Sequence, residues 1–178
     1  MRTGTQILDE KSMQRAIARI SYEIIERNKG VDNLCVIGIL SRGVEIAGRI
    51  AAKILEVEGR QVEVGTLDIT NFRDDRRGES TPDQSEIAFP IEGKKVVLVD
   101  DVIYTGRSVR AAIDALMSRG RPECIQLAVL VDRGHRELPI RADFVGKNLP
   151  TSREETVRVL VRQRDGEDGV MIWKEERR

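Results

Sequence analysis

Two adjacent carboxylates and a short turn rich in hydroxyl groups stand next to each other in this sequence. Asp100 and Asp101 directly follow Val96–Val99, an unbroken apolar run that is typical of a buried parallel strand. The turn Tyr104-Thr-Gly-Arg-Ser108 comes next and leads into a segment with helical spacing. Backbone N–H groups at the start of a helix, together with the helix dipole, bind anions. The turn therefore predicts a pocket for one phosphate group.

The acidic pair needs a partner, because two carboxylates close to a phosphate would repel it. A ribose diol that hydrogen-bonds to both acids would separate them from the phosphate. In an open parallel sheet, ligands bind beyond the carboxyl ends of the strands, where Asp100 and Asp101 are expected. The pair alone would fit many α/β domains as an ordinary strand end, but the whole segment indicates a sugar phosphate.

Other phosphate and acid chemistries have less support. The sequence contains no Gly-x-x-x-x-Gly-Lys-Ser/Thr, and no Gly-x-Gly-x-x-Gly follows the first predicted strand, which argues against nucleotide hydrolysis and hydride transfer. A receiver domain also gathers acids at strand ends, but it has no use for Thr105–Ser108. His135 is the only histidine, and its neighbours Gly134 and Arg136 indicate a polar loop rather than a Ser/His/Asp triad.

Alternating strands and helices must position this segment. Asp9 is a good cap for an amphipathic helix, and two more helices are expected after Gly43 and from Val109. The predicted strands are 34–40, 61–69, 96–99 and 125–131. This order predicts one α/β domain over residues 1–178 with a mainly parallel central sheet flanked by helices.

Two further regions complete the expected fold. Apolar segments near Phe144, at 156–161 and at 170–173 have no helices between them, so they are expected to add antiparallel strands at one edge or over the site. Residues from about 71 to 90 include a polar stretch, at 71–86, that predicts a flexible surface loop.

Composition narrows the possible partners and compartment. Thirty Lys and Arg balance thirty Asp and Glu, so the overall charge gives no sign of nucleic-acid binding, and 3% aromatic residues argue against stacking on many bases. Cys35 and Cys124 lie in strand-like runs, which predicts buried thiols rather than a disulfide or metal site. No apolar stretch is long enough to cross a membrane, so we expect no membrane partner and a reducing cytoplasm.

The thirteen residues from Val96 to Ser108 resemble the phosphoribosyl pyrophosphate signature of type I phosphoribosyltransferases. Segments 68–75, 130–141 and 146–152 resemble the bifunctional pyrimidine operon attenuator and uracil phosphoribosyltransferase (PyrR) family, and the similarity covers nearly the whole chain. The resemblance implies the type I phosphoribosyltransferase fold, with C-terminal antiparallel strands over the site. It also implies that uracil and phosphoribosyl pyrophosphate are converted to UMP and pyrophosphate with Mg²⁺.

The resemblance assigns roles to individual positions. Asp100 and Asp101 would hold the ribose diol and Mg²⁺, and Arg73, in a flexible lid, would complete the catalytic set. The positions implied to bind substrate are Ser41, Arg42 and Gly43 for pyrophosphate, Val102, Ile103, Tyr104, Thr105, Gly106, Arg107 and Ser108 for the sugar phosphate, and Asp132, Arg133 and Val157 for the base. Without the resemblance, Ser41–Gly43 is an ordinary turn, Arg73 a solvated loop residue and Val157 a core residue.

Tyr104 bears on which base is used. Purine-specific relatives carry an acid at this position, where it faces the purine imidazole. A tyrosine here favours a pyrimidine substrate, and uracil is the pyrimidine we expect. A purine phosphoribosyltransferase without RNA binding is the alternative. Displacement at the anomeric carbon should build oxocarbenium character, so charge stabilisation and lid closure are expected to matter more than a nucleophilic side chain.

The resemblance also implies binding to pyrimidine operon leader mRNA, tuned by nucleotides in the active site, and through it transcription attenuation. Positions that match the RNA-binding face are Arg19, Arg27, His135, Arg141 and Lys147. Physical support is weak, because a basic stripe on a helix is usually just solvated. Ala18 and Tyr22 stand where the family often has Thr and His, which predicts altered or weaker RNA binding. A homodimer or higher homo-oligomer is also expected.

Overall fold

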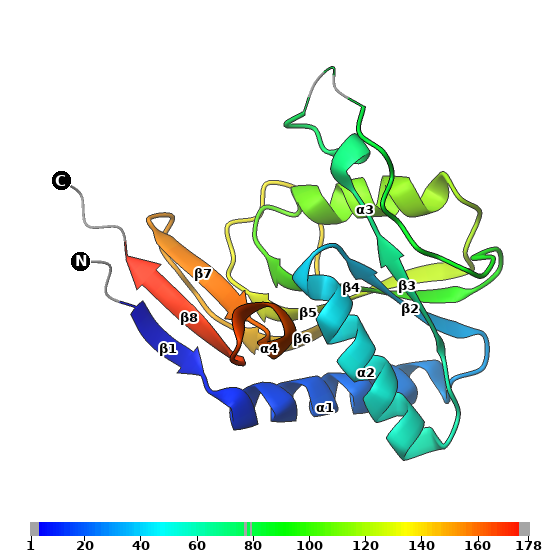
Figure 1. The fold of residues 1–178 in the computed structure, drawn as a ribbon, viewed down its shortest axis with the longest axis horizontal. Helices are drawn as coiled ribbons and strands as arrows, with labels where there is room; N and C mark the ends of the chain where they lie inside the picture. The colour runs from blue at the N-terminus through cyan, green and yellow to red at the C-terminus, as the bar shows by residue number, and fades with distance from the viewer. Residues whose placement is uncertain (1–3, 77, 79, 175–178) are drawn as a thin grey trace.

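The computed structural model describes residues 4–76, 78 and 80–174 (Figure 1). Helices and strands alternate through most of the chain. In chain order the elements are β1 (Gly4–Leu8), α1 (Glu10–Asn28), β2 (Leu34–Ile39), α2 (Arg42–Glu58), β3 (Glu63–Leu67), the 3₁₀ turn η1 (Thr70–Phe72), β4 (Lys95–Ile103), α3 (Arg107–Met117), β5 (Cys124–Asp132), β6 (Phe144–Asn148), β7 (Glu155–Leu160), α4 (Arg162–Asp165) and β8 (Gly169–Lys174).

The strands form two sheets. Five of them make a parallel sheet in the order β3-β2-β4-β5-β6, and three make an antiparallel sheet in the order β1-β8-β7. Helices α1 and α2 cover one face of the parallel sheet and α3 covers the other, with the small sheet to one side (Figure 1). This arrangement confirms the predicted α/β class and the two C-terminal antiparallel strands.

Strand β4 is buried on both faces because its side chains alternate between two apolar clusters. Val97 and Val99 pack with α1 and α2, whereas Val96 and Leu98 pack with α3. All four are fully buried. Burying each such side chain contributes about 1.5–3 kcal/mol, so the strand that carries the acidic pair is firmly held in the core.

The cap predicted for the first helix is present. The Ser12 backbone N–H donates a 2.8 Å hydrogen bond to the Asp9 carboxylate, and Lys29 ends the helix in the left-handed conformation with φ of 53°. Met13, Ile17, Ile20 and Ile24 form the buried stripe of the helix, as their spacing predicts. This helix then packs on α2 and closes one side of the core.

Two glycines bring α2 unusually close to the sheet. A Cβ atom on Gly43 would lie 2.6 Å from the Val99 carbonyl oxygen and 3.3 Å from the Cα of Asp100. A Cβ atom on Gly38 would lie 2.5 Å from the Gly43 carbonyl oxygen. Because both contacts are with backbone, the close approach requires glycine. It places the start of α2 directly beside the first acid.

Some sequence-based expectations were wrong in detail. Strand β6 runs parallel to β5 and extends the main sheet, although no helix lies between them and an antiparallel strand was expected near Phe144. The crossover is made instead by the loop 133–143, which is long enough to carry the chain from the carboxyl end of β5 back to the end of the sheet where β5 begins. Strand β4 continues to Ile103, so Asp100 and Asp101 lie within the strand rather than after it. Strand β1 and helix α4 were not anticipated. Cys35 is buried, but Cys124 is only partly so, and both are free thiols.

The segment expected to be a flexible loop at about 71–90 is held at several points among its described residues. Thr66 and Glu86 form a two-bond antiparallel bridge at its base. The Asn71 side chain exchanges hydrogen bonds with the backbone of Thr81, and Arg119, just after α3, pairs with Asp83 at 2.5 Å. Flexibility of this loop stays a prediction. No helix within the described ranges is long and apolar enough to cross a membrane.

Candidate active site

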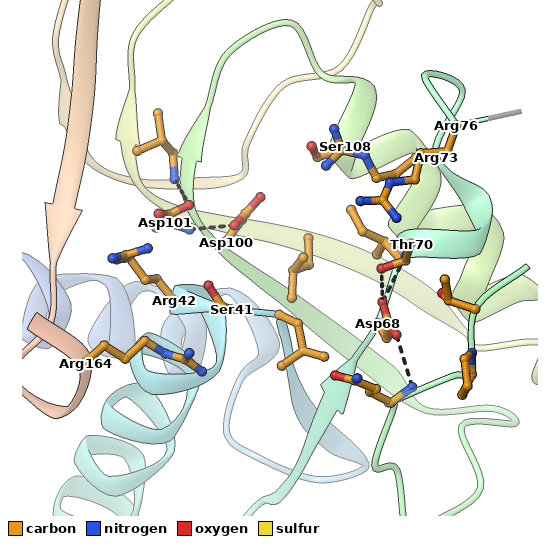
Figure 2. Close-up of a pocket in the computed structure, with 17 residues that line it drawn as sticks. Ser41, Arg42, Asp68, Thr70, Arg73, Arg76, Asp100, Asp101, Ser108 and Arg164 are labelled. Atoms are coloured by element: carbon orange, nitrogen blue, oxygen red, sulfur yellow. Dashed lines mark hydrogen bonds between the residues drawn. The ribbon is translucent and has the colours of Figure 1, made fainter. Parts of the chain in front are cut away.

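A cavity of about 800 Å³ opens at the carboxyl ends of β2, β3 and β4 (Figure 2). This is the edge of a parallel sheet where ligands are expected to bind. Residues lining the cavity include Ser41, Arg42, Asp68, Thr70, Arg73, Arg76, Asp100, Asp101, Val102, Ser108 and Arg164. The structure therefore brings the acidic pair, the 41–42 segment and Ser108, the last residue of the phosphate turn, into one space.

The two acids differ in environment. Asp100 is 9% exposed, and one of its carboxylate oxygens accepts a 2.9 Å hydrogen bond from the Asp101 backbone N–H. Burial first, and then the neighbouring charge of Asp101, raise the pKa of Asp100 well above its ordinary value of 3.8. An ionised pair in this position calls for a cation or for hydrogen-bond donors such as sugar hydroxyls.

The turn after β4 has the geometry of an anion site. Gly106 precedes α3 with φ of 92°, and the Arg107 N–H lies 3.3 Å from the Thr105 hydroxyl. The first turn of α3 contains no acidic residue, so nothing there opposes the positive end of the helix dipole. Backbone N–H groups of Glu137 and Leu138 donate to the Thr105 carbonyl and fix the turn from outside.

The segment Ser41-Arg42-Gly43 joins β2 to α2 at the floor of the cavity, after a cis peptide bond between Leu40 and Ser41. Arg42 does not simply point into the open space. Its Nε and Nη2 donate to the two carboxylate oxygens of Asp165 at 3.2 and 2.8 Å. The sequence gave no sign of this ion pair, because Asp165 belongs to a short helix more than a hundred residues away.

The loop after η1 reaches the phosphate turn. Arg73 pairs with Asp75 through two hydrogen bonds of 2.9 and 2.6 Å, and lines both the main cavity and a smaller adjoining one of about 210 Å³. The second cavity is also lined by Thr105, Arg107 and Ser108. Arg107 donates to Asp74 of the loop at 2.6 Å, so the loop is attached beside the phosphate turn.

A connected group beside the cavity is formed by Asp132, Arg133 and Tyr104. The first two were expected to hold the base. Burial by itself would raise the pKa of Asp132, but hydrogen bonds from Arg136 and the Gly134 N–H lower it below its ordinary value. Arg133 is 8% exposed and lies against the Tyr104 ring. Val157 is partly buried and packs on the same apolar cluster as Val102. Of these, only Val102 lines the main cavity among the residues that the structure describes.

Comparison with known proteins identifies the group to which this arrangement belongs. Residues 3–160 match the family described as phosphoribosyl transferase domain. The chain is also 56% identical to the "Bifunctional protein PyrR" of Bacillus cereus, over 97% of this chain and 99% of that protein. The protein of the same name in Clostridioides difficile is 58% identical, over 94% and 96%. The chain belongs to the PyrR family of phosphoribosyltransferases.

Solved structures support the fold alone. The hypoxanthine phosphoribosyltransferase of Trypanosoma cruzi aligns with a TM-score of 0.75 at 17% identity, over 97% of each chain. One from Staphylococcus aureus aligns with a TM-score of 0.69 at 18% identity, over 94% of this chain and 90% of that one. The type I phosphoribosyltransferase fold and the PyrR family resemblance predicted from sequence are therefore confirmed.

The positions that match the PyrR family's RNA-binding face fall into two places. Arg19 of α1 donates to the carbonyl oxygens of Val145, at 3.1 Å, and Gly146, and Arg27 lies 3.3 Å from Asp143. Both therefore lie beside β6, which carries the exposed Lys147. His135 instead contacts the Tyr104 ring edge-on and lies 2.5 Å from the Thr151 carbonyl oxygen. Arg141 is exposed in the loop before β6.

Several residues of this PyrR family site were missed from sequence. The Asp68 carboxylate accepts hydrogen bonds from the Thr70 N–H and hydroxyl and from the Gln84 N–H, which closes the base of the loop. Its place directly after β3 could have indicated it, because all the parallel strands end at the same edge. Arg164 lines the cavity from α4, an element too short to leave a periodic pattern.

Proposed function

We propose that this chain transfers a 5-phosphoribosyl group from phosphoribosyl pyrophosphate to uracil, giving UMP and pyrophosphate. We propose further that it binds pyrimidine operon leader mRNA and promotes transcription attenuation when pyrimidine nucleotides are abundant. The observation that carries the enzymatic half is the shared cavity, in which Asp100 and Asp101 lie next to the exposed start of α3.

The cavity divides into regions that suit the parts of the donor. The 5′-phosphate binds at the N–H groups and hydroxyls of Thr105–Ser108, and the ribose diol hydrogen-bonds to Asp100 and Asp101. We place the pyrophosphate toward Ser41–Gly43. Arg42 and Arg73 line this cavity from opposite sides (Figure 2). Closure of the loop that carries Arg73 would exclude water from the reacting carbon.

The acidic pair fits Mg²⁺ bound together with the donor. Mg²⁺ prefers oxygen ligands and is usually held by one or two carboxylates plus substrate oxygens and water. Among residues 4–76, 78 and 80–174, no group of three or more His, Cys, Asp or Glu side chains could hold a metal ion by itself. The raised pKa of Asp100 is what burial of this carboxyl group beside the charge of Asp101 produces when no cation neutralises it. When bound, the cation would neutralise charge on the pyrophosphate.

The reaction needs little covalent chemistry from the protein. The bond from the ribose anomeric carbon to the pyrophosphate oxygen breaks, the bond to uracil N1 forms, and the N1 proton is lost. Positive charge builds on the sugar in between, and the carboxylates of Asp100 and Asp101 stabilise it. Asp132 and the backbone of Arg133 hold the polar edge of uracil, and Val157 with Val102 covers its apolar face.

The RNA half of the proposal rests on exposed basic groups at one end of the main sheet. Lys147 and Arg141 are exposed and free to contact phosphates. Arg19 and Arg27 lie beside them, on α1, in contact with the β6 segment. His135 contacts Tyr104 of the phosphate turn, so a nucleotide bound in the active site can affect the position of His135. Such coupling would let a nucleotide change RNA binding. We place this function in the cytoplasm and expect a homodimer or larger homo-oligomer.

A paired assay tests the proposal. UMP formation from uracil, phosphoribosyl pyrophosphate and Mg²⁺ is measured beside a gel-shift titration with a pyrimidine operon leader hairpin, with and without UMP. We expect UMP to form and to tighten RNA binding. Product from hypoxanthine or guanine instead of uracil, with no RNA shift at low salt, would favour the purine alternative.

A further inference from the structure

One face of α2 is joined to the α4 corner of the small sheet by three ion pairs. Arg42, Glu45 and Arg49 are spaced three and four residues apart, so they project on the same side of the helix. Each has a partner of opposite charge. The pairs are Arg42 with Asp165 at 2.8 Å, Glu45 with Arg164 at 2.8 Å, and Arg49 with Asp168 at 2.8 Å.

The first of these pairs belongs to the cavity, whereas the third lies outside it. Arg42 lines the cavity, and Arg49 does not. The side chains of Asp165 and Asp168 are similarly buried, with 9% and 6% exposed. Both acids accept one hydrogen bond from a backbone N–H, of Val161 and Arg162 respectively. Asp165 also lies 3.4 Å from Arg158. The two acids are thus alike in burial and in having a backbone N–H partner, but they differ in their relation to the site.

Asp165 holds the Arg42 guanidinium in one orientation. Hydrogen bonds from Arg42 and from the Val161 N–H lower the pKa of Asp165 despite its burial, so the carboxylate stays ionised. It binds Nε and Nη2 of Arg42, and Nη1 donates no hydrogen bond within the described part of the chain. A two-bond fork fixes the plane as well as the position of a guanidinium.

Arg42 also lies close to the acidic pair. The hydrogen bonds that Arg42 donates to Asp165 are the largest cause of the raised pKa of Arg42, and burial acts against them. The charges of Asp165 and Asp101 raise the pKa of Arg42 further, so the guanidinium lies within electrostatic reach of Asp101. In Figure 2 the Arg42 side chain lies beside Asp101 and Ser41, across the cavity from Arg73. A diphosphate attached to a sugar held at Asp101 would therefore lie close to the Arg42 guanidinium.

We propose that Asp165 is a positioning residue for the pyrophosphate end of the donor and acts through Arg42. This inference rests on the proposed function. A flexible arginine has many rotamers, and holding it in advance spares the ligand the cost of ordering it. Asp165 touches no reacting atom, so its removal affects binding of the diphosphate rather than the uracil site or the chemical step.

The test compares Asp165→Asn with Asp168→Asn in the full chain. We expect Asp165→Asn to raise the KM for phosphoribosyl pyrophosphate and the inhibition constant of pyrophosphate by roughly tenfold, the loss typical when an outer partner of a binding group is removed. The KM for uracil and kcat should change by less than about twofold. Asp168→Asn should leave all four constants near those of the unchanged chain, even if both variants melt at lower temperature.

A second variant guards against a failure to fold. Asp165→Glu keeps the charge but moves the carboxylate by one methylene, so it should raise the same two constants by a smaller factor. Equal effects of Asp165→Asn and Asp168→Asn would overturn the inference, because a merely structural role predicts them. Tighter pyrophosphate binding in Asp165→Asn would also overturn it, since Asp165 would then compete with the ligand. If the unchanged chain forms no UMP, the proposed function fails instead.

Discussion

The guanidinium carbon of Arg133 lies 4.1 Å from the centre of the Tyr104 ring. The other side of this buried cation is also satisfied, because its N–H groups donate to the Thr151 hydroxyl and to the carbonyl oxygens of Ser152 and Glu155. Tyr104 begins the phosphate turn, and Arg133 follows β5 on the side where the base is expected. The contact therefore joins the two ends of the proposed nucleotide site.

Replacing Tyr104 by Ala should weaken both stability and uracil use. Loss of the ring from a desolvated cation costs about 2 kcal/mol of unfolding free energy, measured by urea denaturation. The KM for uracil should rise several-fold, because Arg133 loses its cover. Tyr104→Phe keeps the ring and should retain most of both properties. Similar losses in the two variants would show that the hydroxyl matters and not the contact with Arg133.

Replacing Asp100 by Asn should stabilise the free protein while nearly abolishing activity. The pKa of Asp100 is raised in the folded state, so protonation of this acid stabilises the fold. That stabilisation is complete below about pH 3.8 and is lost as pH rises through the folded pKa. At pH values well above about 3.8 this acid therefore lowers the stability of the fold. Asn removes that cost, which should raise Tm by roughly 2–4 °C for each kcal/mol. UMP formation should fall by roughly 100-fold or more.

The pH dependence separates this explanation from simple packing. The difference in Tm between Asp100→Asn and the unchanged chain should shrink as pH falls toward about 4, where the wild-type acid is protonated. A variant that melts lower than the wild type at high pH would contradict the electrostatic account of Asp100.

Sequence could predict those parts of the site whose residues are neighbours along the chain. It could not predict the parts that depend on tertiary contacts. Residues 96–108 contain strand, acids, turn and helix start in succession, so their arrangement follows from their order. Of these residues, Asp100, Asp101, Val102 and Ser108 line the main cavity. The Asp9 cap and the burial of the strand at 96–99 were equally local and are confirmed. The family resemblance is likewise confirmed by relatives that match nearly the whole chain.

Other features had no local signal. The parallel direction of β6 depends on where the loop 133–143 leads and not on the composition of the strand. The ion pairs of Arg42 with Asp165 and of Arg73 with Asp75 depend on side-chain choices between several nearby acids. Roles of individual residues in substrate and RNA binding stay predictions, and the experiments described here address them.

The close approach of α2 to β4 predicts opposite effects for two glycine substitutions in that helix. Gly43→Ala places a methyl group 2.6 Å from the Val99 carbonyl oxygen, so the helix or Asp100 must shift. We expect a loss of about 1–3 kcal/mol in unfolding free energy and a marked fall in kcat. Gly48→Ala meets no atom within 4 Å and should gain about 0.5–1 kcal/mol without affecting activity. Calorimetric melting of both variants, with UMP assays, checks this.

The exposed basic residues predict a salt-dependent effect on RNA binding. Lys147→Gln or Arg141→Gln should weaken binding to the leader hairpin and lower the slope of log affinity against log salt by about one unit each. Arg27→Gln should also disturb folding, because Arg27 contacts Asp143 and lies over the Phe144 ring at 6.0 Å. Gel shifts at several salt concentrations provide the slopes. Unchanged slopes for Lys147 and Arg141 would place the RNA elsewhere on the molecule.

The most direct measurement is a crystal structure of the chain with UMP. Our account predicts that the phosphate lies against the backbone N–H groups of Gly106–Ser108 and that the ribose hydroxyls face Asp100 and Asp101. A phosphate bound elsewhere, for example between Arg73 and Arg76 with the sugar turned away from both acids, would contradict it.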